Sequence, residues 1–249
     1  MVDRSFSDAR LAALYDKLYP RSQSRDLDFY MPMVMAAEAV LDVGCGTGAL
    51  LHEARQAGHT GRLCGLDPAA SMLAHARKRT DIVWTCGDLT SVNWVCEFDL
   101  VVMTGHAFQV LVEDNDLRAS LAAVRRVLKE DCRFAFETRN PAARGWANWT
   151  MASAVEIADE HGEIVRAIRR VETPFDGRVL SFTETFTCES WDQPLVSRST
   201  LRFLSADALC SFLAEAGFVI EQQFGDWDRR PLTGTSPEII TIARASRRL

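Results

Sequence analysis

The sequence predicts an α/β fold in which a seven-stranded, mostly parallel, doubly wound sheet carries helices on both faces. Short apolar strands alternate with helical segments from residue 39 to residue 137, and a glycine-rich turn joins the first strand to its helix. Residues 150–204 break this alternation with β-branched runs and turn residues, which predicts an inserted antiparallel sheet. We therefore expect an N-terminal helical segment at 1–36, a core at 37–141 and 205–249, and an inserted cap at 142–204.

The elements follow from the spacing of apolar residues. Apolar side chains at helical spacing predict a helix over residues 8–19, which Pro20 ends, and a second helix precedes the first strand. The core then continues as strand 39–43, helix 49–58, strand 62–67, helix 69–79, strand 82–86, strand 98–103, helix 116–129 and strand 132–137. A helix that starts near residue 206 and ends at Gly217, the strand after it, and a last strand over 238–245 complete seven core strands.

Three alternating, β-branched runs build the predicted cap, at 163–173, 178–190 and 195–204. Turn residues separate them at 174–177 and 192–194. Because arginine and glutamate alternate on these strands, one face of the cap sheet is expected to contact solvent.

Composition limits the classes of function. The chain has 249 residues, 47% of them hydrophobic and 25% charged, as expected for one α/β domain with an insertion. A formal charge of −6 gives no diffuse positive field, which favours small or neutral partners over nucleic acid. Seven cysteines without a CxxC pair favour a reduced, cytoplasmic setting. No apolar window reaches 18 residues and no signal peptide is recognisable, so neither membrane insertion nor secretion is expected.

A glycine-rich loop after the first strand is the main chemical feature. In Leu41-Asp-Val-Gly-Cys-Gly-Thr-Gly48, Gly44 and Gly46 let a ligand approach the backbone where a Cβ would obstruct it. Asp67 ends the second strand about twenty residues later, a position from which an acid can bond both hydroxyls of a ribose. This combination predicts a site for a ribose-containing cofactor.

Linked motifs extend this prediction. The loop with Asp42, the pair Asp67-Pro68 before a helix holding Met72, and Gly87-Asp88-Leu89 resemble the successive motifs of class I S-adenosylmethionine-dependent methyltransferases of the small-molecule type. The resemblance covers residues from about 38 to 140 and, more loosely, the terminal helix and strands. It implies a Rossmann-like fold, S-adenosylmethionine as cofactor and S-adenosylhomocysteine as product.

The family also implies roles for particular residues. Its glycine loop approaches the methionine part of the cofactor, its second-strand acid binds the ribose, and its acid after the third strand lies near the adenine. Carried over by position, the cofactor-binding residues are Asp42, Gly44, Cys45, Gly46, Thr47, Gly48, Asp67, Pro68, Met72, Asp88, Leu89, Thr104 and Gly105. Cys45 is expected to fill space in this loop, because methyl transfer from a sulfonium needs no covalent nucleophile.

Other interpretations of the loop remain open. A glycine turn also serves as a plain tight connection or as a nicotinamide or flavin site, but the spacing here is GxGxG with Asp67 and Asp88 in register. The Asn/Asp-Pro-Pro-aromatic tetrad of base-modifying methyltransferases is missing after the fourth strand, and no metal-ligand pattern is visible. A protein that binds the cofactor but acts through a partner, without turnover, is the alternative.

The carboxyl ends of the fourth and fifth strands supply acceptor-side candidates. His106 either removes a proton from the acceptor or only bonds the loop, and Gln109 either joins the site or starts a helix. Arg139 either binds an acceptor oxyanion or pairs with Glu137. The methyl group is expected to reach an oxygen or nitrogen atom of a small molecule, with carbon as a further option.

Aromatic residues outside the core have two interpretations each. Tyr15, Tyr19 and Tyr30 lie in a segment resembling the helical lid of small-molecule methyltransferases, where one of them, Tyr15 above all, contacts ligand or simply packs. Trp146 and Trp149 either line an acceptor pocket or pack the cap onto the core. An inserted sheet can cap its own cleft or pair with a second copy, so both monomer and homodimer are compatible with the sequence.

Overall fold

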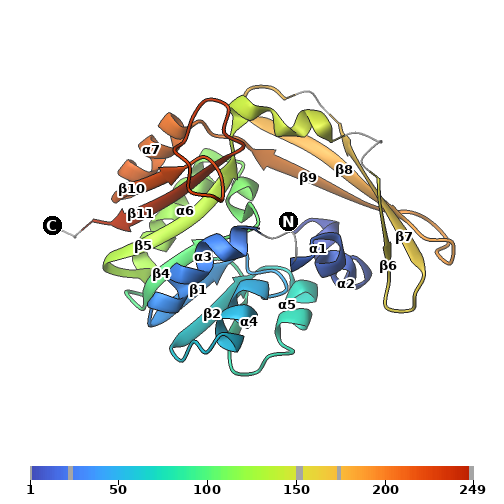
Figure 1. Ribbon diagram of the computed structural model, residues 1–249, viewed down its shortest axis with the longest axis horizontal. Coiled ribbons are helices and arrows are strands. Elements are labelled where there is room, and N and C mark those ends of the chain that lie inside the picture. Colours follow the sequence, from blue (N-terminus) through green and yellow to red (C-terminus); the bar gives the residue numbers. More distant parts are fainter. Residues whose placement is uncertain (1, 22–24, 150–153, 173–174, 247–249) are drawn as a thin grey trace.

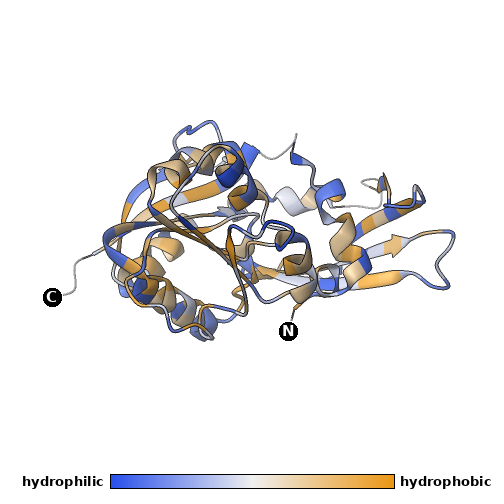
Figure 2. Cartoon of the chain, turned by 90° about the horizontal axis from the view of Figure 1, so that it is seen from below, coloured by the Kyte–Doolittle hydropathy of each residue, from blue (hydrophilic) through white to orange (hydrophobic). Residues whose placement is uncertain are grey.

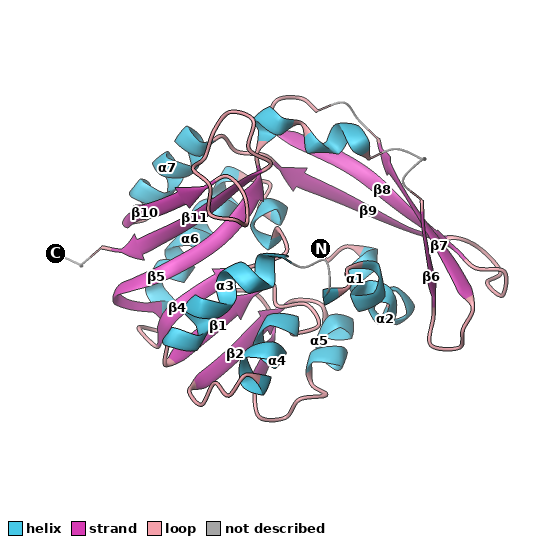
Figure 3. Ribbon diagram, in the orientation of Figure 1, coloured by secondary structure: helices cyan, strands magenta, loops and turns pink. Residues whose placement is uncertain are grey.

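Two sheets organise the protein in the computed structural model, which describes residues 2–21, 25–149, 154–172 and 175–246 (Figures 1 and 3). The larger sheet has seven strands in the order β10-β11-β5-β4-β1-β2-β3, and the smaller has four in the order β6-β7-β8-β9. The four-stranded sheet projects from the core as a long curved arm. The predicted fold class is therefore confirmed.

All but one of the core strands run in the same direction. Strands β1 to β5 pair in parallel, whereas β11 runs antiparallel to both of its neighbours, β5 and β10. The strands are β1 Ala39–Val43, β2 Arg62–Asp67, β3 Val83–Cys86, β4 Phe98–Met103, β5 Leu128–Arg139, β10 Phe218–Phe224 and β11 Glu238–Ala245. As a result, the carboxyl ends of β1, β2, β4 and β5 share one edge with the first residue of β11.

Helices bury both faces of this sheet. Helices α3 (Arg25–Ala36) and α4 (Ala49–Gln56) pack on one face, and α6 (Asp114–Val127) and α7 (Ala206–Glu215) pack on the other. Helix α5 (Ala70–Ala76) packs beside β2 and β3. Hydrophobic residues gather on the central strands and hydrophilic residues on the outer surfaces (Figure 2). Both faces of the sheet are thus shielded, as the continuous apolar runs of its strands predict.

Helices α1 (Arg4–Ser7) and α2 (Ala9–Leu18) lie between the core and the cap (Figure 1). Leu11 and Leu14 of α2 pack against Val165 and Phe186 of the cap, whereas Ala12 packs against the core near α5. We call α1 and α2 the lid helices. Their two-sided packing explains why an isolated apolar stripe precedes the first strand in the sequence.

The cap comprises β6 (Val155–Ala158), β7 (Ile164–Val171), β8 (Val179–Thr187) and β9 (Leu195–Arg202), all antiparallel. The sequence analysis predicted three of these strands and missed β6. That strand is short, lies at the sheet edge and leaves Val155 46% exposed, so it lacks a buried alternating pattern. The predicted turn at 174–177 begins at Pro174, outside the described residues.

Two further boundaries differ from prediction. Helix α6 ends at Val127, and β5 starts at Leu128 instead of residue 132, because Leu128 already pairs with Phe98 of β4 and is fully buried. The short helix α1 precedes the predicted 8–19 helix, and Asp8 separates them by accepting a bond from the Arg10 amide.

No helix in the described part of the chain is long and apolar enough to span a membrane.

Candidate functional site

The glycine loop between β1 and α4 adopts a backbone that favours glycine at each glycine position. Gly44, Gly46 and Gly48 have φ values of +74°, +56° and +82°, in the left-handed region that other residues rarely occupy. A Cβ at Gly44 would lie 2.7 Å from the Cβ of Ala107, at the carboxyl edge of β4. The loop thus packs against the segment that follows β4, and a side chain at position 44 would displace the loop.

Asp67, at the carboxyl end of β2, faces the same loop. Its two carboxylate oxygens accept bonds from the amides of Gly46, at 2.9 Å, and Ala69, at 2.7 Å. Burial raises the pKa of Asp67, although these two bonds oppose the shift. Asp67 therefore links the glycine loop to the start of α5. Its carboxyl group could also accept hydrogen bonds from the hydroxyl groups of a ligand at this place.

Asp42 lies beneath the loop, on β1, and is 1% exposed. Its Oδ1 atom is buried without a hydrogen-bond partner among the described residues. Burial, together with the neighbouring carboxyl groups of Asp67 and Glu137, raises the pKa of Asp42 to about 8. This part of the site thus holds an excess of acidic groups that a cation would stabilise in their ionised form.

The lid helices close over the glycine loop. The hydroxyl of Thr47 donates to Oδ1 of Asp16 on α2 at 2.6 Å, and Ala12 packs against Met72. Tyr15 lies near Gly105, because a Cβ at Gly105 would sit 3.9 Å from the Tyr15 hydroxyl oxygen. Burial raises the pKa of the Tyr15 hydroxyl, so this group stays protonated at neutral pH.

The remaining predicted cofactor residues differ in how accessible they are. Asp88 is exposed, and its Oδ1 accepts the amide and hydroxyl of Thr90, which lowers the pKa of Asp88. Leu89 is buried in the main core, whereas Pro68 is exposed. Cys45 is buried against α5, and burial raises the pKa of its thiol well above the usual value, as suits a space-filling residue.

A second cluster forms where β4, β5 and β11 end. The backbone amide of His106 donates to Oε1 of Glu137 at 2.7 Å, and the hydroxyl of Tyr30 donates to Oε2 at 2.5 Å. The imidazole Nε2 of His106 lies 3.0 Å from Oε2 of Glu238, the first residue of β11. Sequence reasoning missed Glu238, since an acid at the start of a final strand carries no motif.

Burial determines the charges in this cluster. It raises the pKa of Glu137 to about 7 and that of Glu238 to about 8, and it lowers the pKa of His106 to about 3. Glu238 is thus mainly protonated at neutral pH and His106 is neutral, so the carboxyl O–H donates to Nε2. This pair can exchange a proton without creating an isolated buried charge.

These shifts make stability depend on pH. A carboxyl group whose pKa is higher in the folded chain than in the unfolded chain stabilises the fold while it is protonated. This stabilisation is lost as the pH rises from about 4, the pKa in the unfolded chain, to the pKa in the folded chain. The lowered pKa of His106 makes stability rise with pH, but only at pH values below about 6.5, the pKa of histidine in the unfolded chain. Above that pH the carboxyl groups alone remain, so stability should fall through pH 7 and 8.

Arg139 at the end of β5 contacts neither Glu137 oxygen. Its Nη1 donates to the amide oxygen of Gln109 at 2.8 Å, and its guanidinium carbon lies 5.3 Å from the centre of the Trp149 ring. Gln109 is 1% exposed in a 3-10 helix, Ala107–Val110, and its Nε2 donates to the carbonyl of Arg202. The side-chain ion pair with Glu137 that the sequence left open is therefore not formed.

The two tryptophans after β5 take different places. Trp146 packs between Phe175 and Phe203, with ring centres 4.5 and 4.6 Å away, and these contacts lie within the cap. Trp149 instead lies near two arginines, Arg139 of the core and Arg169 of the cap. Only Trp149 therefore reaches the cluster of polar residues at the carboxyl edge.

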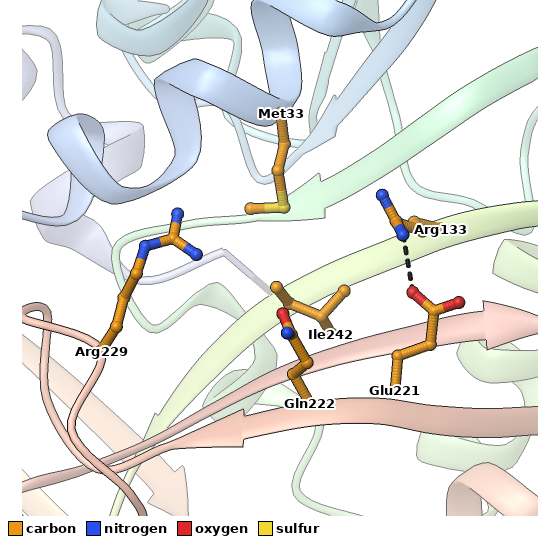
Figure 4. A pocket seen from close by; sticks show the side chains of 6 residues that line it. All are labelled: Met33, Arg133, Glu221, Gln222, Arg229 and Ile242. Carbon is orange, nitrogen blue, oxygen red and sulfur yellow. Dashed lines mark hydrogen bonds and ion pairs between the residues drawn. The ribbon is translucent and has the colours of Figure 1, made fainter.

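Two surface hollows lie away from these clusters. One of about 530 Å³ lies over β10 and β11, lined by Met33, Gln222, Arg229 and Ile242, with the Arg133–Glu221 pair at one side (Figure 4). The other, about 260 Å³, lies between the end of α3 and residues 58–61. Neither is lined by a predicted site residue. Among the described residues, no group of three or more histidines, cysteines or acids could hold a metal ion.

Comparison with known proteins identifies the domain around the glycine loop. Residues 40–131 match the model of a methyltransferase domain family. Over this range the chain is similar to a methyltransferase domain. This match begins in β1 and extends through α6 to the first residues of β5, so it includes the glycine loop and the second-strand acid. The resemblance seen in the sequence is thereby confirmed.

Relatives of the methyltransferase domain differ in what they modify. The chain is 34% identical to a 2-phytyl-1,4-naphtoquinone methyltransferase of Thermosynechococcus vestitus over 42% of this chain and 51% of that one. It is 26% identical to a cypemycin N-terminal methyltransferase of a Streptomyces species over 82% and 81%. Four of the curated relatives match over 36% to 51% of their own length. Activity and substrate therefore remain matters of proposal.

A solved structure shares the fold over almost the whole chain. The S-adenosylmethionine-bound amino pentose methyltransferase CalS10 of Micromonospora echinaspora superposes with a TM-score of 0.69, covering 94% of this chain and 97% of its own. Sequence identity is 22%, so this likeness shows the fold. The methyltransferase domain, the lid helices and the cap thus occur together in a known arrangement.

Proposed function

We propose that this chain is an S-adenosylmethionine-dependent methyltransferase that modifies a small molecule, with the lid at 1–36, the core at 37–141 and 205–249, and the cap at 142–204. The observation that carries the proposal is the glycine loop held between two acids, Asp67 bound to the Gly46 amide and Asp42 buried beneath it. Seven free cysteines support a cytoplasmic location.

The residues present fit the cofactor. S-adenosylmethionine carries a sulfonium and an ammonium, and Asp42 offers a buried carboxyl oxygen that lacks a partner among the described residues. A nearby cation would favour the ionised form of Asp42, whose pKa is raised to about 8 by burial and by adjacent acids. Asp67 would accept the ribose hydroxyls, and Met72 would contact the adenine. When bound, the cofactor supplies an activated methyl group.

The protein's own contribution is alignment and proton removal. The lid helices would exclude water, since Thr47 bonds Asp16 across the loop. When Glu238 is ionised, His106 would accept the proton released by the acceptor and pass its Nε2 proton to the Glu238 carboxylate, whose pKa of about 8 lies near the operating pH. A neutral amine attacks without prior deprotonation, whereas a hydroxyl needs a stronger base than His106 with a pKa of about 3. These values favour nitrogen over oxygen.

Transfer from a labelled methyl donor to a panel of amines, alcohols and carboxylic acids tests the proposal. We expect turnover on an amine and a loss of about 100-fold in kcat for His106→Ala and Glu238→Gln, with S-adenosylhomocysteine affinity unchanged. Glu221→Gln, which alters an acid bonded to Arg133 outside the site, serves as control. Binding of S-adenosylhomocysteine without transfer to any acceptor would support the partner-dependent alternative. A folded chain that binds reduced nicotinamide instead would overturn the proposal.

A further inference from the structure

We propose that the acceptor carries an oxyanion group, a carboxylate or a phosphate, and that Arg139 of the core and Arg169 of the cap bind this group beside Trp149. The inference rests on the proposed function, because it names the substrate class of the same site. It adds a cap residue that the sequence analysis did not select, and it assigns the cap a direct part in recognition.

Arg139 has no ion-pair partner within 4 Å in the described part of the chain. Its side chain is partly buried, and the carboxyl group of Glu238 attracts it from a greater distance. Its protein contacts are the Gln109 amide oxygen, at 2.8 Å, and the Trp149 ring. A guanidinium has five N–H donors and keeps its charge at any physiological pH. Burying it is costly unless an anion pairs with it, and a ligand oxyanion would do so.

Arg169 approaches the same tryptophan from the cap. Its Nη2 donates to the Tyr19 hydroxyl at 2.6 Å and to Oε1 of Glu184 at 3.1 Å, while its guanidinium carbon lies 5.1 Å from the Trp149 ring centre. Its Nε atom is buried and has no hydrogen-bond partner among the described residues. Glu184 balances the charge of Arg169, but one N–H donor is left unsatisfied, at a cost that a bound oxygen would remove.

The Trp149 ring limits the distance between the two arginines. Since both lie about 5 Å from one ring centre, their guanidinium carbons are at most about 10 Å apart. Each can reach an oxygen about 4 Å from that carbon through a hydrogen bond of ordinary length. Burial lowers the pKa of Arg139, Glu238 opposes that shift and the positive charge of Arg169 adds to it, so an anion between the two arginines would relieve their repulsion.

The register of the sheet places this group next to the proposed chemistry. Arg139 pairs directly with Glu238 across β5 and β11, and Glu238 bonds His106. Glu238 attracts Arg139 but compensates its charge only in part at pH 7, because burial raises the pKa of Glu238 to about 8. An acceptor anchored at Arg139 would thus present a neighbouring atom to the His106–Glu238 pair. Planar, bidentate pairing favours carboxylate or phosphate over neutral hydroxyl groups.

Calorimetric titration of the full chain with pyrophosphate, inorganic phosphate and succinate tests this inference, with and without saturating S-adenosylhomocysteine. At least one anion should bind the wild type, and Arg139→Met should weaken it at least tenfold. Arg169→Met should weaken it several-fold, and Arg139→Lys, which keeps charge but not the planar fork, should fall between. Arg229→Met is the matched control, since Arg229 also stacks on an aromatic ring, 4.4 Å from Phe29, and lines the hollow in Figure 4.

The outcomes separate this inference from the proposed function. Binding that survives Arg229→Met but not Arg139→Met, in variants with wild-type circular dichroism, supports the oxyanion site. No anion binding by the folded wild type, equal binding by Arg139→Met, or a loss confined to Arg229→Met overturns it. Affinity for S-adenosylhomocysteine is read in the same titrations. If that ligand binds while every anion fails, only the substrate class is wrong; if the anion binds through Arg139 and that ligand fails, the methyltransferase proposal falls and the anion site stands.

Discussion

Replacement of Asp67 by alanine is expected to weaken S-adenosylhomocysteine binding without unfolding the chain. In the proposed complex the carboxylate accepts bonds from the ribose, and a hydrogen bond to an ionised acceptor contributes about 1.5–3 kcal/mol. Losing it should raise Kd by roughly 10- to 150-fold. Asp67→Asn keeps one carbonyl oxygen for the Ala69 amide but loses the charge, so its Kd should lie between those of wild type and Asp67→Ala.

The free protein should respond as well, but modestly. Asp67→Ala leaves the Gly46 and Ala69 amides without their acceptor, at a cost of about 1–3 kcal/mol for each group that water cannot reach. Removing a carboxylate whose pKa is raised by burial recovers part of this cost. A net loss of about 2 kcal/mol would lower the melting temperature by roughly 4–8 °C for a chain of this size.

A matched acid separates ligand binding from stability. Asp99 also accepts a strand amide, that of Ala39 at 2.8 Å, but it lies on β4 at the opposite end from the site. Asp99→Ala should therefore lower the melting temperature and leave Kd within about twofold, measured by isothermal titration calorimetry. A folded Asp67→Ala protein with wild-type Kd would refute the reasoning, and so would an equal loss of affinity in both variants.

The remaining predictions concern the loop, the acid cluster and the lid. Gly44→Ala should weaken S-adenosylhomocysteine binding at least tenfold in calorimetry, whereas Gly58→Ala, with φ +94° and no atom within 4 Å of the added Cβ, should lower only the melting temperature; equal affinities would contradict this. By scanning calorimetry, the melting temperature should fall between about pH 6.5 and 8.5 as Glu137 and Glu238 ionise, and Glu238→Gln should reduce that fall; parallel curves would argue against it. Asp16→Ala should speed S-adenosylhomocysteine dissociation several-fold in stopped-flow, because the glycine loop loses its bond to the lid; an unchanged rate would exclude that role.

Local signals account for what could be predicted at the cofactor end of the site. The glycine loop and Asp67 are each encoded within a few residues, because a strand end, a positive-φ turn and a helix start are short-range features. Parallel strands then bring their carboxyl ends together without further information. Helix α2 of the lid was also recognisable, since its apolar spacing is local, whereas the short helix α1 was not predicted.

The acceptor end required the tertiary structure. Glu238 reaches His106 across 132 residues only because β11 is the one reversed strand, which puts its first residue at the carboxyl edge of the others. Arg169 of β7 and Arg139 of β5 lie against one ring, that of Trp149, because the tertiary structure brings the cap beside the end of β5. The raised pKa of Glu238 likewise comes from burial, which no short segment can specify. Sequence alone thus indicated the cofactor class, whereas strand direction and domain packing assembled the residues that face the acceptor.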